Sequence, residues 1–200
     1  MRIVVDKTGF PFLEIDNLGA FGLWPVTKIQ YERHISETNS FGDKLYDVIV
    51  KMNPRVSTNE INKENYEGVF ITGITPQEAI NYANWIGPGF GLPTIDEWRK
   101  FYMTIKDESI PVYTLSGLSI KATDIWNHLY KRMKKMRDFA LFEGGLVEWV
   151  TEKDKYVGVG KPRQHFHPNT YDPQKDSIKP LKERIYYFGF RLIKRYNNDH

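Results

Sequence analysis

His165 and His167 are the residues whose type and spacing come closest to a metal site. On an extended strand, residues i and i+2 face the same side, so both imidazoles could bind one ion. A facial triad also needs a carboxylate, and Asp172 and Glu148 are the nearest candidates. The alternative is that both histidines are exposed loop residues, because an H-x-H pair is common and the sequence does not identify a third ligand. We therefore expect no cofactor, and the pair His165 and His167 is the metal-binding alternative.

Other catalytic chemistries find less support in the sequence. The chain has 200 residues and no cysteine, which excludes disulfide scaffolds, cysteine nucleophiles, thiolate metal sites and iron–sulfur clusters. It contains no G-x-S-x-G, P-loop or H-E-x-x-H motif. Glu143 and Glu148 could act as acid and base, but we expect Glu148 to be hydrogen-bonded inside the fold. The sequence thus favours a protein without catalytic activity.

The charge balance does not indicate a nucleic-acid-binding protein. The formal net charge is +3, and the one concentrated group of basic residues lies within 131–137. Residues 123–139 carry apolar side chains at helical spacing, which predicts an amphipathic helix whose other face is basic. A solvated face is the ordinary interpretation, and the alternative is a docking surface for an acidic partner or a nucleic-acid backbone.

Three further helices are predicted from their first residues. Thr27–Gln30, Thr75–Glu78 and Thr94–Glu97 each have the capping-box pattern, in which the threonine hydroxyl and the glutamine or glutamate satisfy amides at the helix start. Pro76 is at the first helical position, and Gly87 and Pro88 should end that helix. The candidate strands are short and irregularly spaced: 3–5, 46–50, 69–72, 146–150, 156–159 and 188–193. Together they predict one α+β domain over residues 1–200.

Four segments, in order, resemble the sulfatase-modifying-factor family, the formylglycine-generating-enzyme-like domains. Residues 21–31, FGLWPVTKIQY, resemble the family's E-V-T-x-x-x-Y entry, with Pro25 in place of the usual acidic residue. Residues 73–98 contain ITPQEAINYANW and GLPTIDEW, which are similar to the central V-S-W-x-D-A-x-A-Y-x-x-W and R-L-P-T-E-A-E-W motifs. GGLVEW at 144–149 is similar to G-N-V-W-E-W, and FGFRL at 188–192 is similar to the closing G-F-R. The matches span about residues 21–193.

This resemblance implies a variant of the C-type lectin fold, with a twisted sheet of short strands, two or three flanking helices and long irregular loops. It also implies that the E-W and G-F-R motifs are strands of one central sheet. The formylglycine-generating enzymes oxidise a cysteine at a copper site that is held by two cysteines. Because this chain has no cysteine, that site cannot be built. The resemblance therefore implies the scaffold of the family without its oxidase chemistry.

A scaffold without its catalytic ligands favours binding. The variable proteins of diversity-generating retroelements resemble the same fold, and their ligand-binding face lies between the E-W-like strand and the closing motif. The matching stretch here is about 148–190, and loops rich in aromatic, Arg and Asn residues suit recognition of a protein or a glycan. The candidate ligand-binding residues are Trp149, Tyr156, Arg163, His165, His167, Asn169, Tyr171 and Tyr187. The alternative is a metal-dependent enzyme of the same superfamily that uses a site without cysteine.

The sequence carries no recognisable targeting segment. The apolar run at residues 3–5 is interrupted by Asp6 and Lys7, well short of a signal-peptide core, and no stretch is long enough to span a bilayer. We expect a cytoplasmic protein with no membrane partner, although export to a virion or cell surface by another route stays open.

Overall fold

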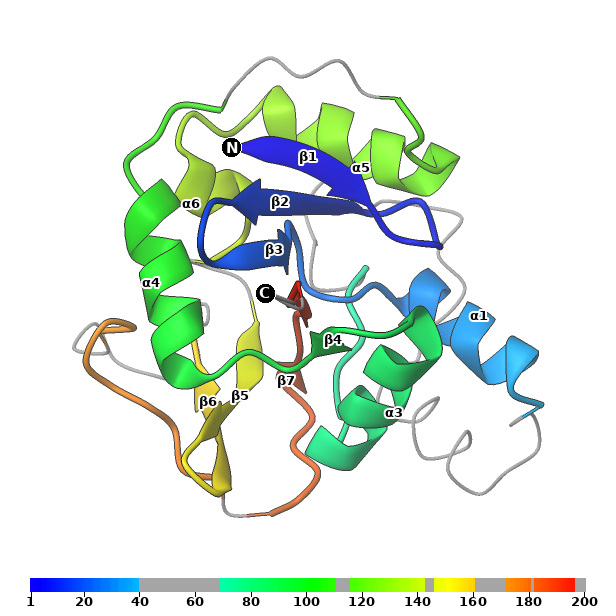
Figure 1. Cartoon of the computed structure of the whole chain (residues 1–200), viewed down its shortest axis with the longest axis vertical. Helices are drawn as coiled ribbons and strands as arrows, with labels where there is room; N and C mark the ends of the chain where they lie inside the picture. Colours follow the sequence, from blue (N-terminus) through cyan, green and yellow to red (C-terminus); the bar gives the residue numbers. More distant parts are fainter. Residues whose placement is uncertain (40–68, 111–115, 143–145, 161–171, 181, 197–200) are drawn as a thin grey trace.

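The computed structural model describes residues 1–39, 69–110, 116–142, 146–160, 172–180 and 182–196. Over these residues the protein has the predicted α+β architecture, with helices around two sheets of short strands (Figure 1). The elements in chain order are β1 (Arg2–Val5), β2 (Pro11–Ile15), β3 (Gly19–Gly22), α1 (Lys28–Glu37), α3 (Pro76–Ile86), β4 (Phe90–Gly91), α4 (Ile95–Ile105), α5 (Ile120–Tyr130), α6 (Met136–Phe139), β5 (Val147–Glu152), β6 (Lys155–Val159), β7 (Phe188–Gly189) and β8 (Ile193–Lys194).

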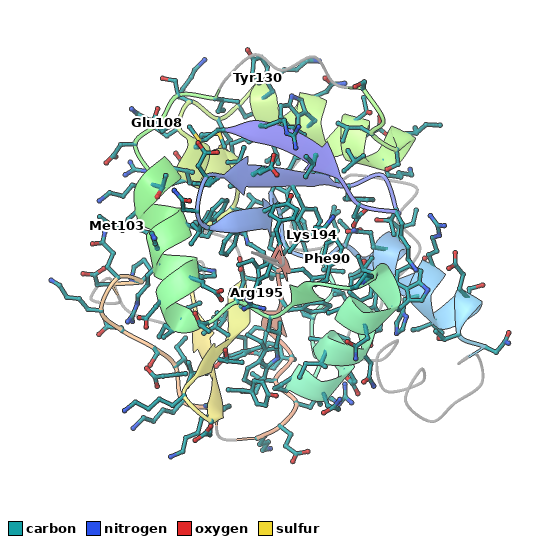
Figure 2. All side chains as sticks on the ribbon, viewed as in Figure 1. Phe90, Met103, Glu108, Tyr130, Lys194 and Arg195 are labelled. Carbon is teal, nitrogen blue, oxygen red and sulfur yellow. The ribbon has the colours of Figure 1, made fainter. Side chains whose placement is uncertain are left out.

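The larger sheet has five strands in the order β1-β2-β3-β8-β4, and every pairing is antiparallel. Figure 2 shows Phe90, Lys194 and Arg195 close together where β4 meets β8, and Phe90 is paired with Lys194 in the register. The Lys194 ammonium lies 5.5 Å from the centroid of the Phe90 ring, while Arg195 forms an ion pair of 2.6 Å with Glu97 on α4. Arg195, which follows β8, thus connects the larger sheet to α4.

The smaller sheet has three strands in the order β6-β5-β7. β5 and β6 form an antiparallel hairpin with Lys153 and Asp154 at its tip, and β5 runs parallel to β7. The expected strand over 188–193 is therefore two short strands in different sheets, because the chain crosses from one sheet to the other at Phe190–Leu192. The expected strand at 69–72 is only a single bridge between Phe70 and Thr27, and 46–50 lies outside the described residues.

All three predicted capping boxes are present. Thr27, Thr75 and Thr94 each accept a hydrogen bond from the third helical amide, and the Gln30, Glu78 and Glu97 side chains accept from the cap amides in return. The helix that starts at Pro76 ends at Gly87, as expected. Helix starts could be predicted because every group in a capping box lies within four consecutive residues.

The prediction of one helix over 123–139 is wrong. The chain forms α5, leaves the helix at Lys131 and forms the single turn α6 from Met136. The Met136 amide donates to the Glu108 carbonyl, and the Lys135 ammonium donates to the Asp107 carbonyl at 2.6 Å. These contacts with the segment after α4 compete with continued helix, so the residues 131–137 do not form one basic helical face.

The central strands β2 and β3 of the larger sheet have buried residues on both faces. Alternate residues of β2 and β3 enter two different cores, with Leu13 and Phe21 in one and Phe12 and Ala20 in the other. The first core also takes α4, α5 and α6, and the second takes α1 and α3, which Figure 1 shows on the opposite side. Among the described helices, none combines the length and apolarity that a membrane span requires.

Candidate ligand-binding groove

A buried ion pair joins Glu148 and Arg191. Glu148 lies near the start of β5 and Arg191 follows β7, and their side chains are 1% and 0% exposed. Arg191 binds both carboxylate oxygens, with Nε 2.9 Å from Oε2 and Nη2 2.8 Å from Oε1. The Trp98 indole donates to Oε2 at 3.0 Å. Glu148 is therefore hydrogen-bonded inside the fold, as expected from the sequence.

The remaining Arg191 donors bind backbone carbonyls. Nη1 donates to Leu23 at 2.9 Å and to Gly22 at 3.2 Å, and Nη2 donates to Ala140 at 2.8 Å. The five N–H groups of the guanidinium thus all have acceptors. Because the ion pair is inaccessible and fully bonded, it connects β3, α4 and the smaller sheet, and it has no free atom to offer a substrate or a metal.

An open groove of about 1090 Å³ lies at the far end of β5 from this ion pair. Its walls are the tip of the β5–β6 hairpin, residues 179–180 and 182–183, and the start of α3, which meet at the lower end of the molecule in Figure 1. The described residues that line it are Thr75, Pro76, Gln77, Trp149, Glu152, Lys153, Asp154, Lys155, Tyr156, Val157, Lys179, Pro180, Lys182 and Glu183. The groove lies within the predicted binding stretch 148–190, apart from the residues of α3.

The pleat of the hairpin decides which of its residues line the base of the groove. Trp149 pairs with Gly158 and Thr151 pairs with Tyr156, so these four residues lie on one face of the smaller sheet. Trp149 is 1% exposed, and its indole donates to the Ile74 carbonyl at 2.6 Å. Tyr156 is 37% exposed and offers an aromatic surface to the groove.

A second ion pair fixes the chain just after the groove residue Glu183. Arg184 forms a bidentate ion pair with Glu78 in the first turn of α3 and also donates to the Gly73 carbonyl. The segment after Glu183 is thereby attached to the start of α3. Burial raises the pKa of the neighbouring Tyr31 phenol, and the Glu78 carboxylate adds to that rise. The wall is thus fixed by charged contacts, while the residues at the rim are free to meet a ligand.

Four lysines and three carboxylates line the groove. Lys153, Lys155, Lys179 and Lys182 form no ion pair or hydrogen bond through their side chains with the residues the structure describes. Lys153 also has a φ of +54° at the hairpin tip, in the left-handed region where glycine or asparagine is favoured. The backbone of a lysine is strained at that position, which lowers the free energy of unfolding.

The predicted ligand-binding residues have three different locations. Tyr156 lies in the groove with part of its ring exposed, and Trp149 lies below it as part of the core. Tyr187 lies outside the groove, half-buried between the rings of Tyr186 and Phe188 at 5.0 and 5.2 Å. The remaining predicted residues lie outside the described part of the chain: Arg163, His165, His167, Asn169 and Tyr171.

The proposed metal pair, His165 and His167, and the candidate base Glu143 also lie outside the described residues. Both carboxylates suggested as a third ligand have other partners. Glu148 binds Arg191, and Asp172 accepts the Gln174 amide at 2.9 Å and pairs with Lys175 at 3.5 Å. Over the described ranges, no group of three histidine or acidic side chains converges as a metal site.

Sequence reasoning missed the specific lysines of the groove and the contribution of α3. The hairpin itself had a signal, because the charged run EKDK at 152–155 separates two apolar strands. The residues Thr75–Gln77 had none, because they are more than 70 positions away from the hairpin that they face. No protein-family model matches the sequence, and a search of curated proteins found no match.

Proposed function

We propose that this chain is a ligand-binding protein without catalytic activity, built on a sulfatase-modifying-factor-like scaffold of the C-type lectin type. Its binding face is the groove between the β5–β6 hairpin, residues 179–180 and 182–183, and the start of α3. The observation that carries this proposal is the location of an open groove of about 1090 Å³ inside the stretch that the resemblance marks for ligands.

The polar residues of the E-W and G-F-R motifs support the same proposal. Glu148 and Arg191 are the charged residues of these motifs, and both are buried and bonded to each other. A carboxylate without a free oxygen cannot abstract a proton or bind an ion without breaking the core. Recognition by the exposed groove is consistent with this arrangement, whereas chemistry at the motifs is not.

The groove also has the composition of a recognition surface. It combines the exposed ring of Tyr156 with lysines that have no described partner, and such residues bind ligands through large contact area and charge. Residues at the hairpin tip lie at the surface, so substitutions there can change the groove without changing the packing of the core. The ligand class that follows at this level is a protein or a glycan.

The test is binding to a peptide array and a glycan array, with one variant that fills the groove. Gln77 lies on the groove side of α3, and Asn84 is exposed further along the same helix and outside the groove. We expect the wild type and Asn84→Trp to bind the same ligands and Gln77→Trp to lose them. Binding that survives Gln77→Trp, or no binding on either array, would contradict the proposal.

A finer part of the proposal is that the chain is a variable protein of a diversity-generating retroelement. It predicts a reverse-transcriptase gene near the coding sequence and a near-copy of the 3′ coding segment that differs at adenines. Sequencing the surrounding DNA tests this directly. If neither feature is present, the retroelement part is overturned and the ligand-binding proposal is judged on the array result.

A further inference from the structure

The outer edge of β6 is paired at one residue, and at the next pairing position it has no partner among the described residues. Gly158 exchanges two backbone hydrogen bonds of 2.8 Å with Ile178, on the side of β6 away from β5. Residues two apart in an antiparallel strand direct their N–H and C=O groups to the same side. Tyr156 therefore presents its backbone donor and acceptor at this outer edge, and no residue in the described ranges bonds them.

Pro180 explains why the neighbouring segment does not close this edge. The bridge between Gly158 and Ile178 is antiparallel, so continuing its register would place Pro180 opposite Tyr156. A proline has no N–H and cannot donate to the Tyr156 carbonyl. Within the described residues the backbone pairing therefore stops after Ile178, and the Tyr156 edge faces the groove that Tyr156 and Pro180 both line.

The charges around this edge are mixed, with a small excess of lysine. Lys153, Lys155, Lys179 and Lys182 surround it together with Glu152, Asp154 and Glu183. A uniform polyanion such as a nucleic acid or a sulfated glycan would meet three carboxylates in the groove, and the chain as a whole carries only +3. A polypeptide can place its acidic side chains opposite the lysines and neutral ones elsewhere, so the mixed lining favours a peptide.

We infer that the groove binds an extended segment of a partner protein that carries an excess of Asp and Glu. The segment adds to the outer edge of β6 through the Tyr156 N–H and C=O, and its carboxylates pair with the groove lysines. Alternate side chains of such a segment point to the two faces of the sheet, and one set packs against the Tyr156 ring. This inference rests on the proposed binding function and names its ligand class.

The test is fluorescence anisotropy with a labelled peptide of eight residues in which glutamate and threonine alternate. We expect saturable binding that weakens with salt, and an affinity at least about tenfold lower for the double variant Lys155→Glu, Lys179→Glu. Lys100→Glu is the matched control, because Lys100 is exposed on α4 away from the groove, and it should bind as the wild type does. Circular dichroism of each variant establishes that it is folded.

A second peptide tests the backbone pairing separately from the charges. N-methylation of alternate amides leaves every carboxylate in place but removes the donors that an added strand uses, so one of the two methylation registers should lower the affinity about tenfold. Equal affinity for both methylated peptides and the unmodified one would overturn strand addition. Equal affinity of the wild type and the double variant for the acidic peptide would overturn the role of the lysines in binding. The lysines would then serve to protect the strand edge from association with other strands.

The outcomes also separate this inference from the proposed function. Failure of the acidic peptide, together with an array ligand that Gln77→Trp abolishes, overturns the ligand class and leaves the groove as a binding site. Binding instead to phosphatidylserine vesicles or to heparin, with loss in the lysine variant, would overturn the peptide and assign a different macromolecule. Failure of both peptide and arrays would overturn both proposals.

Discussion

The two ends of β5 have opposite chemistry. At its start, Glu148 is buried and both of its oxygens bind donors from Arg191 and Trp98. At its end, the hairpin carries Lys153 and Lys155, which have no ionic partner among the described residues. On β6, the outward backbone groups of Tyr156 have no partner within the described structure. Buried polar groups need partners within the protein, whereas accessible ones can bond to water and can exchange that water for a ligand.

This difference separates a buried ion pair that connects elements of the fold from an accessible groove that we propose as the binding site. The ion pair connects distant parts of the chain, because Arg191 also donates to the carbonyls of Leu23 and Ala140. The groove needs only surface residues and an exposed strand edge. Substitutions at the two ends should therefore change different properties, stability at the start of β5 and binding at its end.

The largest expected effect is on the ion pair. Arg191→Met leaves the Glu148 carboxylate buried without its partner, so the free energy of unfolding should fall by about 3–5 kcal/mol. Arg195→Met is the matched control, because Arg195 pairs with Glu97 in a partly exposed position, and its loss should be about 0–1 kcal/mol. Urea denaturation measures both. Similar losses for the two variants would contradict the contrast between buried and exposed pairs.

The middle of the hairpin should show an intermediate effect. A Cβ at Gly158 would overlap the side chains of Phe188 and Val147, which pack on that face of the sheet. Gly158→Ala should therefore lower the free energy of unfolding by about 1–3 kcal/mol through overpacking. Thermal unfolding followed by circular dichroism provides the measurement. An unchanged midpoint of thermal unfolding would show that Phe188 and Val147 leave room for a methyl group at position 158.

At the hairpin tip we expect stability and binding to change in opposite directions. Lys153→Gly relieves the left-handed backbone at φ +54°, and the free energy of unfolding should rise by about 0.5 kcal/mol. The same change removes a groove lysine, so affinity for the acidic peptide should fall about threefold. Lys153→Asn, which tolerates this backbone and also lacks the charge, should lower the affinity equally. A loss of stability in Lys153→Gly would contradict the strained turn.

The smallest expected effect is a difference in pH dependence. Burial lowers the pKa of His34, with the Lys7 charge adding to the decrease and Glu37 opposing it, and its Nδ1 has no partner among described residues. The unfolded chain then binds a proton below about pH 6.5 that the folded chain binds only at lower pH, so stability falls as the pH drops below that value. His34→Phe should reduce this loss.

Peptide affinity should not follow the same curve. No histidine is among the described residues that line the groove, so binding should be nearly constant between pH 6 and 8. Anisotropy titrations and urea denaturation at the same pH values make the comparison. A binding curve that bends together with the stability curve would show that the groove depends on a titrating group.

The sequence predicted the parts of the fold that depend on neighbouring residues. The capping boxes at Thr27, Thr75 and Thr94 are local, and so all three helices begin where expected. The prediction of a helix over 123–139 failed because a backbone bond to Glu108 and a bridge between Ser109 and Lys135 replace its second half. β2 and β3 were not predicted, although Asp16 and Asn17 at their turn are typical hairpin residues.

The site followed the same rule. The stretch 148–190 could be proposed from motif order, and it contains the hairpin and the residues 179–180 and 182–183 that form most of the groove. The pairing of Glu148 with Arg191, across 43 positions, and the arrival of α3 at the groove depend on tertiary packing. The outward direction of the Tyr156 backbone groups, which have no partner in the described part of the chain, depends on a register that a sequence pattern does not specify.

Amide hydrogen exchange at Tyr156 tests the central claim most directly. If an acidic segment adds to β6, the Tyr156 amide gains a hydrogen bond, and its exchange should slow at least about tenfold at saturation with the alternating glutamate–threonine peptide. The Gly158 amide is the internal control, because it is already bonded to Ile178 and should keep its rate. Unchanged exchange at Tyr156 while the peptide is bound would contradict the account.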